Sequence, residues 1–360
     1  MTEDEIRSPL HDAQVGAGAE IIWEEDGYPW TNGFGDVVGE YEAIRSGTGL
    51  WDLFSTCKYE VEGPDAGRLI QRRFTNDVSA MQPGSVRYGA FVNADGMMVD
   101  DGNVYQRADD RFWIFINTAE LQEWFRESGG GLDASIEHRT GDLPMISVQG
   151  PTSRSLLQSL TDADLSALPY FRFWPDAVKV AGVPAWVLRT GFSGEIGFEL
   201  VTDNDSVATL WEALNDAGGR PFGLEAIDIA RIEAGLIIIA LDYQPEESSP
   251  FDMTMDRFVK AGTECVGAEA LARTGADPPR RLKTLTIEGD APAAGTAVTR
   301  DGVDVGTLTS PTTSPRFGSI GLAVLRTDAA ADGQTLVVGD VAATVAPLSI
   351  YDPQKQKPRG

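Results

Sequence analysis

The chain has 360 residues, 42% of them hydrophobic, and its 55 acidic and 29 basic residues give it a formal net charge of −26. The length suits two or three domains. The sequence contains no apolar run long enough to span a membrane and no basic stripe able to follow a phosphate backbone. We therefore expect neither a membrane nor a nucleic-acid partner. The acids are dispersed and only six of the bases are Lys, a surface that stays soluble when salt screens charge, and we therefore expect a salt-adapted source.

The N-terminal segment carries no pattern of a secretion signal. MTEDEIRSPLHDAQ (1–14) is acidic and lacks a basic region followed by an apolar stretch. Cys57 and Cys265 stand alone without a CxxC partner, which argues for a reducing compartment and against a disulfide frame or a cysteine metal site. We therefore expect a cytoplasmic protein.

The first half of the chain alternates predicted strands with short helices. A helix follows Gly63-Pro64-Asp65, because Pro suits the first turn of a helix, and the turn NADG predicts a hairpin between two alternating segments. The predicted elements are strands at 58–62, 86–92, 96–106, 111–117 and 145–148, and helices at 63–74, 119–127 and 153–160.

The second half changes character after a composition break at 275–281, GADPPRR. Beyond the break, short strands separated by glycine turns predict a small β-barrel or sandwich. The elements expected before the break are strands at 178–190 and 197–202 and helices at 205–217 and 224–236, and those after it are strands at 282–288, 303–309, 318–325 and 333–345. The fold class is therefore α+β followed by a small β domain.

Several kinds of site are excluded by composition. The chain has two histidines, His11 and His138, which are far apart and lack acidic partners at ligand spacing, so neither a histidine metal site nor a Ser-His-Asp triad is expected. No phosphate-binding GxxxxGK[ST] loop is present. We expect no bound metal, and a chemistry that depends on carboxylates, aromatic rings and backbone, or on a reactive ligand.

The stretch NADGMMVDDGNVY (93–105) places two adjacent acids inside a predicted strand. Side chains alternate between the faces of a strand, so Asp101 is expected to share its face with Met97, Val99 and Tyr105, while Asp100 lies on the other face. At least one acid should then lie beside apolar groups, where its charged form needs hydrogen-bond donors. The alternative is an edge strand on which both acids are solvated.

A second stretch, RTGFSGEIGFEL (189–200), has three glycines within seven residues between two strands. Glycine lets the backbone approach a flat ligand closely. Glu199 follows between Phe198 and Leu200, and a buried carboxylate can accept two parallel N–H groups of an aminopyrimidinone ring. Together these features suggest a site for a planar heterocycle.

These stretches, with others, resemble the folate-dependent aminomethyltransferase superfamily, which includes the glycine cleavage T-protein and demethylases such as that for dimethylsulfoniopropionate. The resemblance implies a three-lobed cloverleaf with tetrahydrofolate in a central channel. It also implies a folate-binding region at 1–275, with a second lobe inserted around 56–140, and a C-terminal β-barrel at 281–357. The matching stretches are GLWDLFS (49–55), FTNDVSAMQPG (74–84), YGAFVNADGMMVDDGNVY (88–105), FIN (115–117), MISVQGP (145–151), RTGFSGEIGFEL (189–200), GLEAIDIARIEAGL (223–236), SPFDM (249–253) and VGAEAL (266–271).

The resemblance also assigns roles to individual residues. Asp101 matches the catalytic aspartate of the family, which holds N5 of tetrahydrofolate and stabilises the positive charge that develops there. Asp100 is expected to be structural or solvated. The residues implied to contact the cofactor are Tyr88, Asn117, Phe171, Phe192 and Glu199.

Departures from the T-protein pattern decide which function is expected. Ile227 stands where the T-protein has an arginine, and Ser55-Thr56 stands where the family has Ser-His. The expected function is therefore transfer of a methyl or aminomethyl group from a small N-, S- or O-linked donor to N5 of tetrahydrofolate, with a carrier protein or partner enzyme left open. One alternative is the glycine cleavage aminomethyltransferase that acts on a lipoyl carrier. A second is a folate-binding iron–sulfur assembly factor, whose cysteine signature is only partly kept around Cys265.

Overall fold

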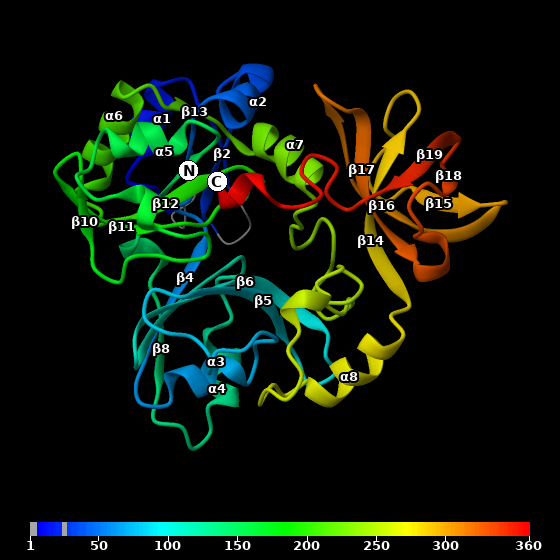
Figure 1. Ribbon diagram of the computed structural model, residues 1–360, viewed down its shortest axis with the longest axis horizontal. Coiled ribbons are helices and arrows are strands. Elements are labelled where there is room, and N and C mark those ends of the chain that lie inside the picture. Colours follow the sequence, from blue (N-terminus) through cyan, green and yellow to red (C-terminus); the bar gives the residue numbers. More distant parts are fainter. Residues whose placement is uncertain (1–5, 24–26) are drawn as a thin grey trace.

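The computed structural model describes residues 6–23 and 27–360 and has an α+β architecture of three lobes. Figure 1 shows a mixed lobe at upper left, an inserted lobe below it and a closed barrel at the right. No helix in the described residues is long and apolar enough to cross a membrane. The three-lobed cloverleaf with a C-terminal barrel is therefore the observed fold.

The mixed lobe is built on a six-stranded sheet of order β10-β11-β12-β9-β3-β13. All residues of β9 and β12 are buried, as in strands that are covered on both faces. A two-stranded ribbon, β1–β2, and five helices belong to this part of the chain. The bounds are α1 (His11–Gly16), β1 (Glu20–Trp23), β2 (Pro29–Gly33), α2 (Val37–Ser46), β3 (Gly49–Asp52), β9 (Met145–Gln149), α5 (Ser153–Gln158), β10 (Val178–Val180), β11 (Val183–Leu188), β12 (Gly197–Val201), α6 (Val207–Asp216), β13 (Arg220–Pro221) and α7 (Leu224–Ala234).

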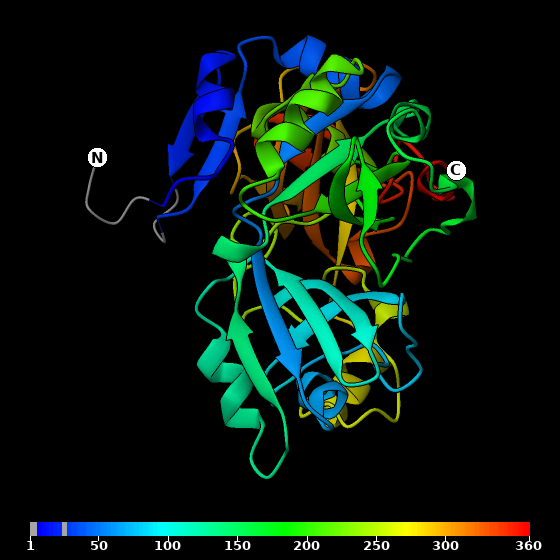
Figure 2. The same cartoon turned by 90° about the vertical axis from the view of Figure 1, so that its left-hand side faces the viewer.

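The inserted lobe is a five-stranded sheet of order β5-β6-β7-β4-β8, seen in the lower half of Figure 2. β6 lies inside this sheet, paired antiparallel with β5 and with β7. The bounds are β4 (Cys57–Glu62), α3 (Ala66–Gln71), β5 (Val86–Val92), β6 (Met98–Ala108), β7 (Arg111–Ile116), α4 (Gln122–Ser128) and β8 (Ser135–His138).

The C-terminal lobe is a closed barrel of order β14-β17-β16-β15-β18-β19. Closure leaves no free sheet edge, and an apolar cluster fills the interior. The bounds are β14 (Arg280–Ile287), β15 (Ala297–Arg300), β16 (Val303–Ser314), β17 (Gly318–Arg326), β18 (Thr335–Val338) and β19 (Val341–Ala346), preceded by α8 (Ala268–Ala276).

The three lobes meet at α7 and the segment that follows it. Arg231 of α7 is fully buried and contacts Asp242 at 2.5 Å and the hydroxyl of Ser310 on β16 at 2.7 Å. Beside this polar junction, one apolar cluster combines Ala90 and Met98 of the inserted lobe with residues of the connecting segment and of the barrel. The inserted lobe is therefore held against both other lobes.

Several predicted elements differ in extent from the observed ones. α3 begins later than the predicted helix at 63–74, because Gly63 has a φ of 125°, which a helix does not accept. The strand predicted at 333–345 is the hairpin β18–β19, which turns at Gly339 with a φ of 60°. Elements that were not predicted include α1, β1, β2, α2, β3, β15 and α8.

Candidate active site

The candidate site is built on β6, the strand that carries the acid doublet. The register of β6 against β5 shifts at Val99, which is a β-bulge. A bulge changes which residues of a strand share a face, and the pairing on either side of it places Met98 on the same face as Asp101. The expected alternation from Met97 therefore does not hold: β6 begins at Met98, and Val99 is the unpaired residue of the bulge. Tyr105 lies after the bulge and does share that face.

Asp101 is a buried carboxylate whose two oxygens each accept a phenol hydrogen bond. It is 6% exposed. The hydroxyl of Tyr243 donates to Oδ1 and that of Tyr88 to Oδ2, both at 2.6 Å. Burial, and then the neighbouring charge of Asp100, raise the pKa of Asp101 to about 7, against the opposing effect of the two hydroxyls. A carboxyl group with a pKa near neutrality can gain or lose a proton at physiological pH.

Asp100 has a different environment on the opposite face. Its side chain accepts hydrogen bonds from the backbone N–H of Asn117, Thr118 and Asp101 and from the side-chain amide of Asn117, at 2.7 to 3.2 Å. It is fully buried, so its role is structural and the alternative of two solvated acids on an edge strand is wrong. The amide of Asn117, predicted to contact the cofactor, also donates to the backbone carbonyl of Asp101 at 3.1 Å.

Glu199 lies on β12 and is 7% exposed. Thr190 donates to its Oε2 at 2.5 Å, and the hydroxyl of Tyr105 lies 3.5 Å from the same oxygen. Among residues 6–23 and 27–360, both hydrogen bonds to Glu199 are to Oε2, which leaves Oε1 available to a ligand. Burial raises the pKa of this carboxyl group.

An unpartnered acceptor and two aromatic rings belong to the same region as the two carboxylates. Asn103 follows Asp101 on the same face, and its Oδ1 is buried without a hydrogen-bond partner in the described part of the chain. Phe171 and Phe192 are partly buried and pack against the cluster that contains Tyr105. An unpartnered carbonyl oxygen, a free carboxylate oxygen and aromatic rings fit a planar ring that carries N–H groups. The residues present therefore fit the tetrahydrofolate that the resemblance implies.

Lys58 is a buried cation on β4 that the sequence analysis did not assign. Its ammonium donates to three backbone carbonyls of the segment 53–56, at 2.7 to 3.0 Å. Burial lowers the pKa of Lys58 to about 7, and the acidic groups of Cys57, Asp52 and Glu199 act in the opposite direction. The ammonium is thus placed where it offsets part of the negative charge of Glu199.

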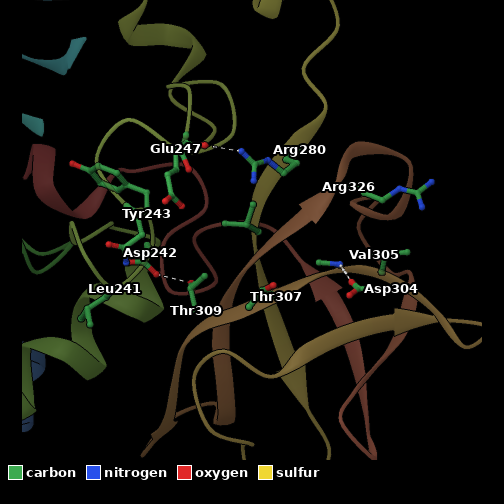
Figure 3. A pocket seen from close by; sticks show the side chains of 14 residues that line it. Leu241, Asp242, Tyr243, Glu247, Arg280, Asp304, Val305, Thr307, Thr309 and Arg326 are labelled. Atoms are coloured by element: carbon green, nitrogen blue, oxygen red, sulfur yellow. Dashed lines mark hydrogen bonds between the residues drawn. The ribbon is translucent and has the colours of Figure 1, made fainter. Parts of the chain in front are cut away.

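A polar cavity of about 460 Å³ borders the site between the segment 241–248 and the barrel. Figure 3 shows Tyr243 at its edge with the hydroxyl pointing away from the barrel strands, and that hydroxyl is the group that contacts Asp101. The charged groups of the wall are tied to neighbours: Asp242 accepts from Thr309 at 2.7 Å, and Arg280 donates to the carbonyl of Glu247 at 3.1 Å. The cavity therefore lies behind Tyr243 and does not itself contain Asp101.

The structure joins some predicted residues directly and adds others. The hydroxyl of Tyr88 donates to Asp101, and the side-chain amide of Asn117 donates to the neighbouring residue on β6, Asp100. Tyr105 could have been assigned from strand alternation, because it lies on the Asp101 face. Tyr243 could not, since it comes from a loop with no periodic pattern.

Comparison with known proteins now identifies the family. The GCVT N-terminal domain model matches residues 10–263, and the CAF17 C-terminal beta-barrel domain model matches residues 280–350. A probable aminomethyltransferase of Halobacterium salinarum is 36% identical over 345 residues, which are 92% of this chain and 93% of the relative. The aminomethyltransferase of Bacillus subtilis is 32% identical over 347 residues, 93% of each chain.

A solved structure has the same fold. The crystal structure of glycine cleavage system aminomethyltransferase T from Bartonella henselae superposes with a TM-score of 0.86 at 22% identity, covering 96% of this chain and 98% of the other. With curated relatives above 30% identity over almost the whole length, the chain belongs to the folate-dependent aminomethyltransferase family and is a one-carbon transferase.

Proposed function

We propose that the protein transfers a one-carbon unit from an aminomethylated carrier to N5 of tetrahydrofolate, with release of ammonia, as aminomethyltransferases of the glycine cleavage type do. The observation that carries this proposal is the buried carboxylate of Asp101, gripped by two phenol hydroxyls at 2.6 Å. The names of relatives that match over nearly the whole chain support the aminomethyl donor.

Asp101 performs the central step by position and charge. When bound, tetrahydrofolate supplies the nucleophilic nitrogen that receives the carbon. The buried carboxylate would hold that nitrogen and stabilise the positive charge that develops on it. Asp100 keeps this strand segment in place through its four hydrogen bonds.

The far end of the ring is held by Glu199 and Asn103. Oε1 of Glu199 and the unpartnered Oδ1 of Asn103 are the acceptors that would receive N–H groups of the pterin. Phe171 and Phe192 would supply apolar surface for the ring, and Lys58 offsets part of the charge of Glu199.

The folate tail is bound by cations other than the arginine that opens the long helix of the T-protein. Ile227, which replaces it, is 1% exposed in an apolar cluster and offers no charge. The positive charge of Arg257 acts on the hydroxyl of Tyr88 and on Lys355. Burial, and then this neighbouring charge, lower the pKa of Lys355 to about 8. These two cations support a site for the tail carboxylates beside Tyr88.

A second candidate function is demethylation of a small N-, S- or O-methylated donor, with 5-methyltetrahydrofolate as the product. The observation that favours it is the segment 53–56, which contains no histidine and in which Ser55 donates to the carbonyl of Pro29. The assembly-factor alternative has less support. Cys265 is 6% exposed, and burial raises the pKa of its thiol, so it is not presented to a cluster.

The product distinguishes these functions. The protein, tetrahydrofolate and an aminomethyl-lipoyl carrier are expected to give methylenetetrahydrofolate and ammonia, while dimethylsulfoniopropionate, dimethylglycine, sarcosine and aryl methyl ethers give no product. Formation of 5-methyltetrahydrofolate from one of these small donors, and none from the carrier, would replace the proposal by the second candidate.

Asp101→Asn should keep folate affinity within about threefold but lower turnover by at least about 100-fold; unchanged turnover removes Asp101 from the mechanism.

A further inference from the structure

Tyr243 is the residue through which the connecting segment reaches the reactive carboxylate. It is 3% exposed, and its hydroxyl donates to Oδ1 of Asp101 at 2.6 Å. Tyr88, which donates to Oδ2, belongs to the inserted lobe, whereas Tyr243 lies between α7 and the barrel. The carboxylate is therefore clamped by phenols from two different parts of the chain.

The segment around Tyr243 is anchored before it. Asp242 accepts hydrogen bonds from Arg231 at 2.5 Å, from Thr309 and Ser310 of the barrel at 2.7 Å, and from the backbone N–H of Ile238 at 2.9 Å. Every donor in this set belongs to α7, to the barrel or to the start of the segment itself. The backbone next to Tyr243 is thus tied to two rigid elements.

The segment is also anchored after Tyr243. The N–H of Glu246 donates to the carbonyl of Met98 at 2.6 Å, and the N–H of Met98 donates to the carbonyl of Ser248 at 2.8 Å. Met98 begins β6, three residues before Asp101. These backbone hydrogen bonds consequently fix the position of the segment that carries Tyr243 relative to the strand that carries Asp101.

We propose that Tyr243 is a positioning residue, whose hydroxyl fixes Oδ1 of Asp101 and keeps this carboxylate ionised for its contact with the one-carbon acceptor. The inference rests on the proposed function in one respect: the proposed function supplies the contact of Asp101 with the one-carbon acceptor. A hydrogen bond donated to a carboxylate favours its charged form. The groups that act on Asp101 are Asp100 on its own strand, Tyr88 on β5, and Tyr243 and Asp242 on the connecting segment.

Removal of the hydroxyl therefore has a defined direction. In Tyr243→Phe the carboxylate loses one of its two phenol donors, while burial and the charge of Asp100 remain, so the pKa of Asp101 rises above its value of about 7. Hydrogen bonds to charged groups are typically worth a change of about one pH unit or more. The acidic limb of the pH–rate profile should move to higher pH by about one unit, so turnover at pH 7 falls by up to roughly tenfold and recovers in alkaline buffer.

Tyr41→Phe is a matched control that separates positioning from structure. Tyr41 is also fully buried and also donates to a carboxylate at 2.6 Å, but that carboxylate is Glu233, at the junction of α2 and α7. Its removal is expected to lower the thermal midpoint without moving the pH profile. A merely structural role for Tyr243 would produce the same result in Tyr243→Phe.

The decisive measurement is the titration of Asp101 in the free protein, followed by the infrared band of its carboxyl group and assigned by the absence of that band in Asp101→Asn. Tyr243→Phe should shift this titration to higher pH by about one unit, and Tyr88→Phe, which removes the other donor, should shift it the same way. An unchanged titration in folded Tyr243→Phe overturns the proposal. Because this measurement needs neither donor nor folate, it remains valid if the proposed transfer reaction fails.

Discussion

At the scale of single residues, four N–H donors surround the carboxylate of Asp100, whereas two phenol hydroxyls reach that of Asp101. Burial raises the pKa of both carboxyl groups, and at Asp100 the hydrogen bonds from Asn117, Thr118 and the N–H of Asp101 oppose this effect. At Asp101, burial and then the charge of Asp100 raise the pKa to about 7, and only two phenol hydroxyls oppose them. Two adjacent aspartates thus lie in different environments, and this difference supports the structural role proposed for Asp100 and the catalytic role proposed for Asp101.

The raised pKa of Asp101 predicts a stability change in Asp101→Asn. Because the pKa in the folded protein, about 7, lies above the ordinary value of 3.8, ionisation of this buried group destabilises the fold as the pH rises from about 4 to 7. A shift of that size corresponds to an upper limit of about 4 kcal/mol. We expect Asp101→Asn to be more stable than the wild type at pH 8, with a smaller difference at pH 5.

Urea unfolding of both proteins at pH 5 and pH 8 tests this expectation. Asp109→Asn, at an exposed position, is the control and should leave the free energy of unfolding unchanged at either pH. Equal destabilisation by Asp101→Asn at the two pH values would mean that Asp101 carries no such ionisation cost.

At the scale of elements, the parts that could be predicted are those with a local pattern. The hairpin at 86–106 follows from the NADG turn and from alternation, and the barrel follows from short strands with glycine turns. The bulge at Val99 has no such signal, because it depends on how β6 meets its neighbours, and it changes which residues share the face of Asp101. Tyr243 is missed for a related reason: its place is set by Asp242 and Met98, which are brought together only by the fold.

The close approach of β6 to β7 gives a prediction for Gly102. A Cβ atom at this position would lie 2.1 Å from the carbonyl oxygen of Phe115 and 2.7 Å from Cγ2 of Ile116. The backbone oxygen cannot move without breaking the pairing that places Asp101 and Asn117. Gly102→Ala should therefore lower the free energy of unfolding by more than about 2 kcal/mol and reduce turnover.

Gly130→Ala provides the matched control, because a Cβ atom at Gly130 has no atom within 4 Å. Urea midpoints of the two variants at one pH, with turnover measured on the same samples, make the comparison. Wild-type stability in Gly102→Ala would show that β6 and β7 can separate at this point without cost.

At the scale of the whole molecule, buried charges add to the apolar clusters that join the lobes. Arg231 and Asp242 both contact Ser310 of the barrel, whereas Arg45 and Glu233 pair at 2.8 Å between α2 and α7 inside the mixed lobe; all four charged side chains are buried. Breaking one partner of a buried pair leaves an uncompensated charge. The contact between α7 and the barrel thus includes a buried ion pair that bulk salt screens little.

The surface charge should respond to salt in the opposite way. A net charge of −26 spread over 360 residues repels itself, and mobile cations reduce this repulsion. We therefore expect the thermal midpoint to rise with KCl concentration between about 0.1 and 2 M. Each kcal/mol of added stability should raise it by roughly 2–4 °C in a protein of this size class. A variant with Glu120, Glu127 and Glu212 changed to Gln, three exposed acids, should show a smaller rise. Equal slopes in the two proteins, or no rise in the wild type, would mean that the acidic surface does not adapt this protein to salt.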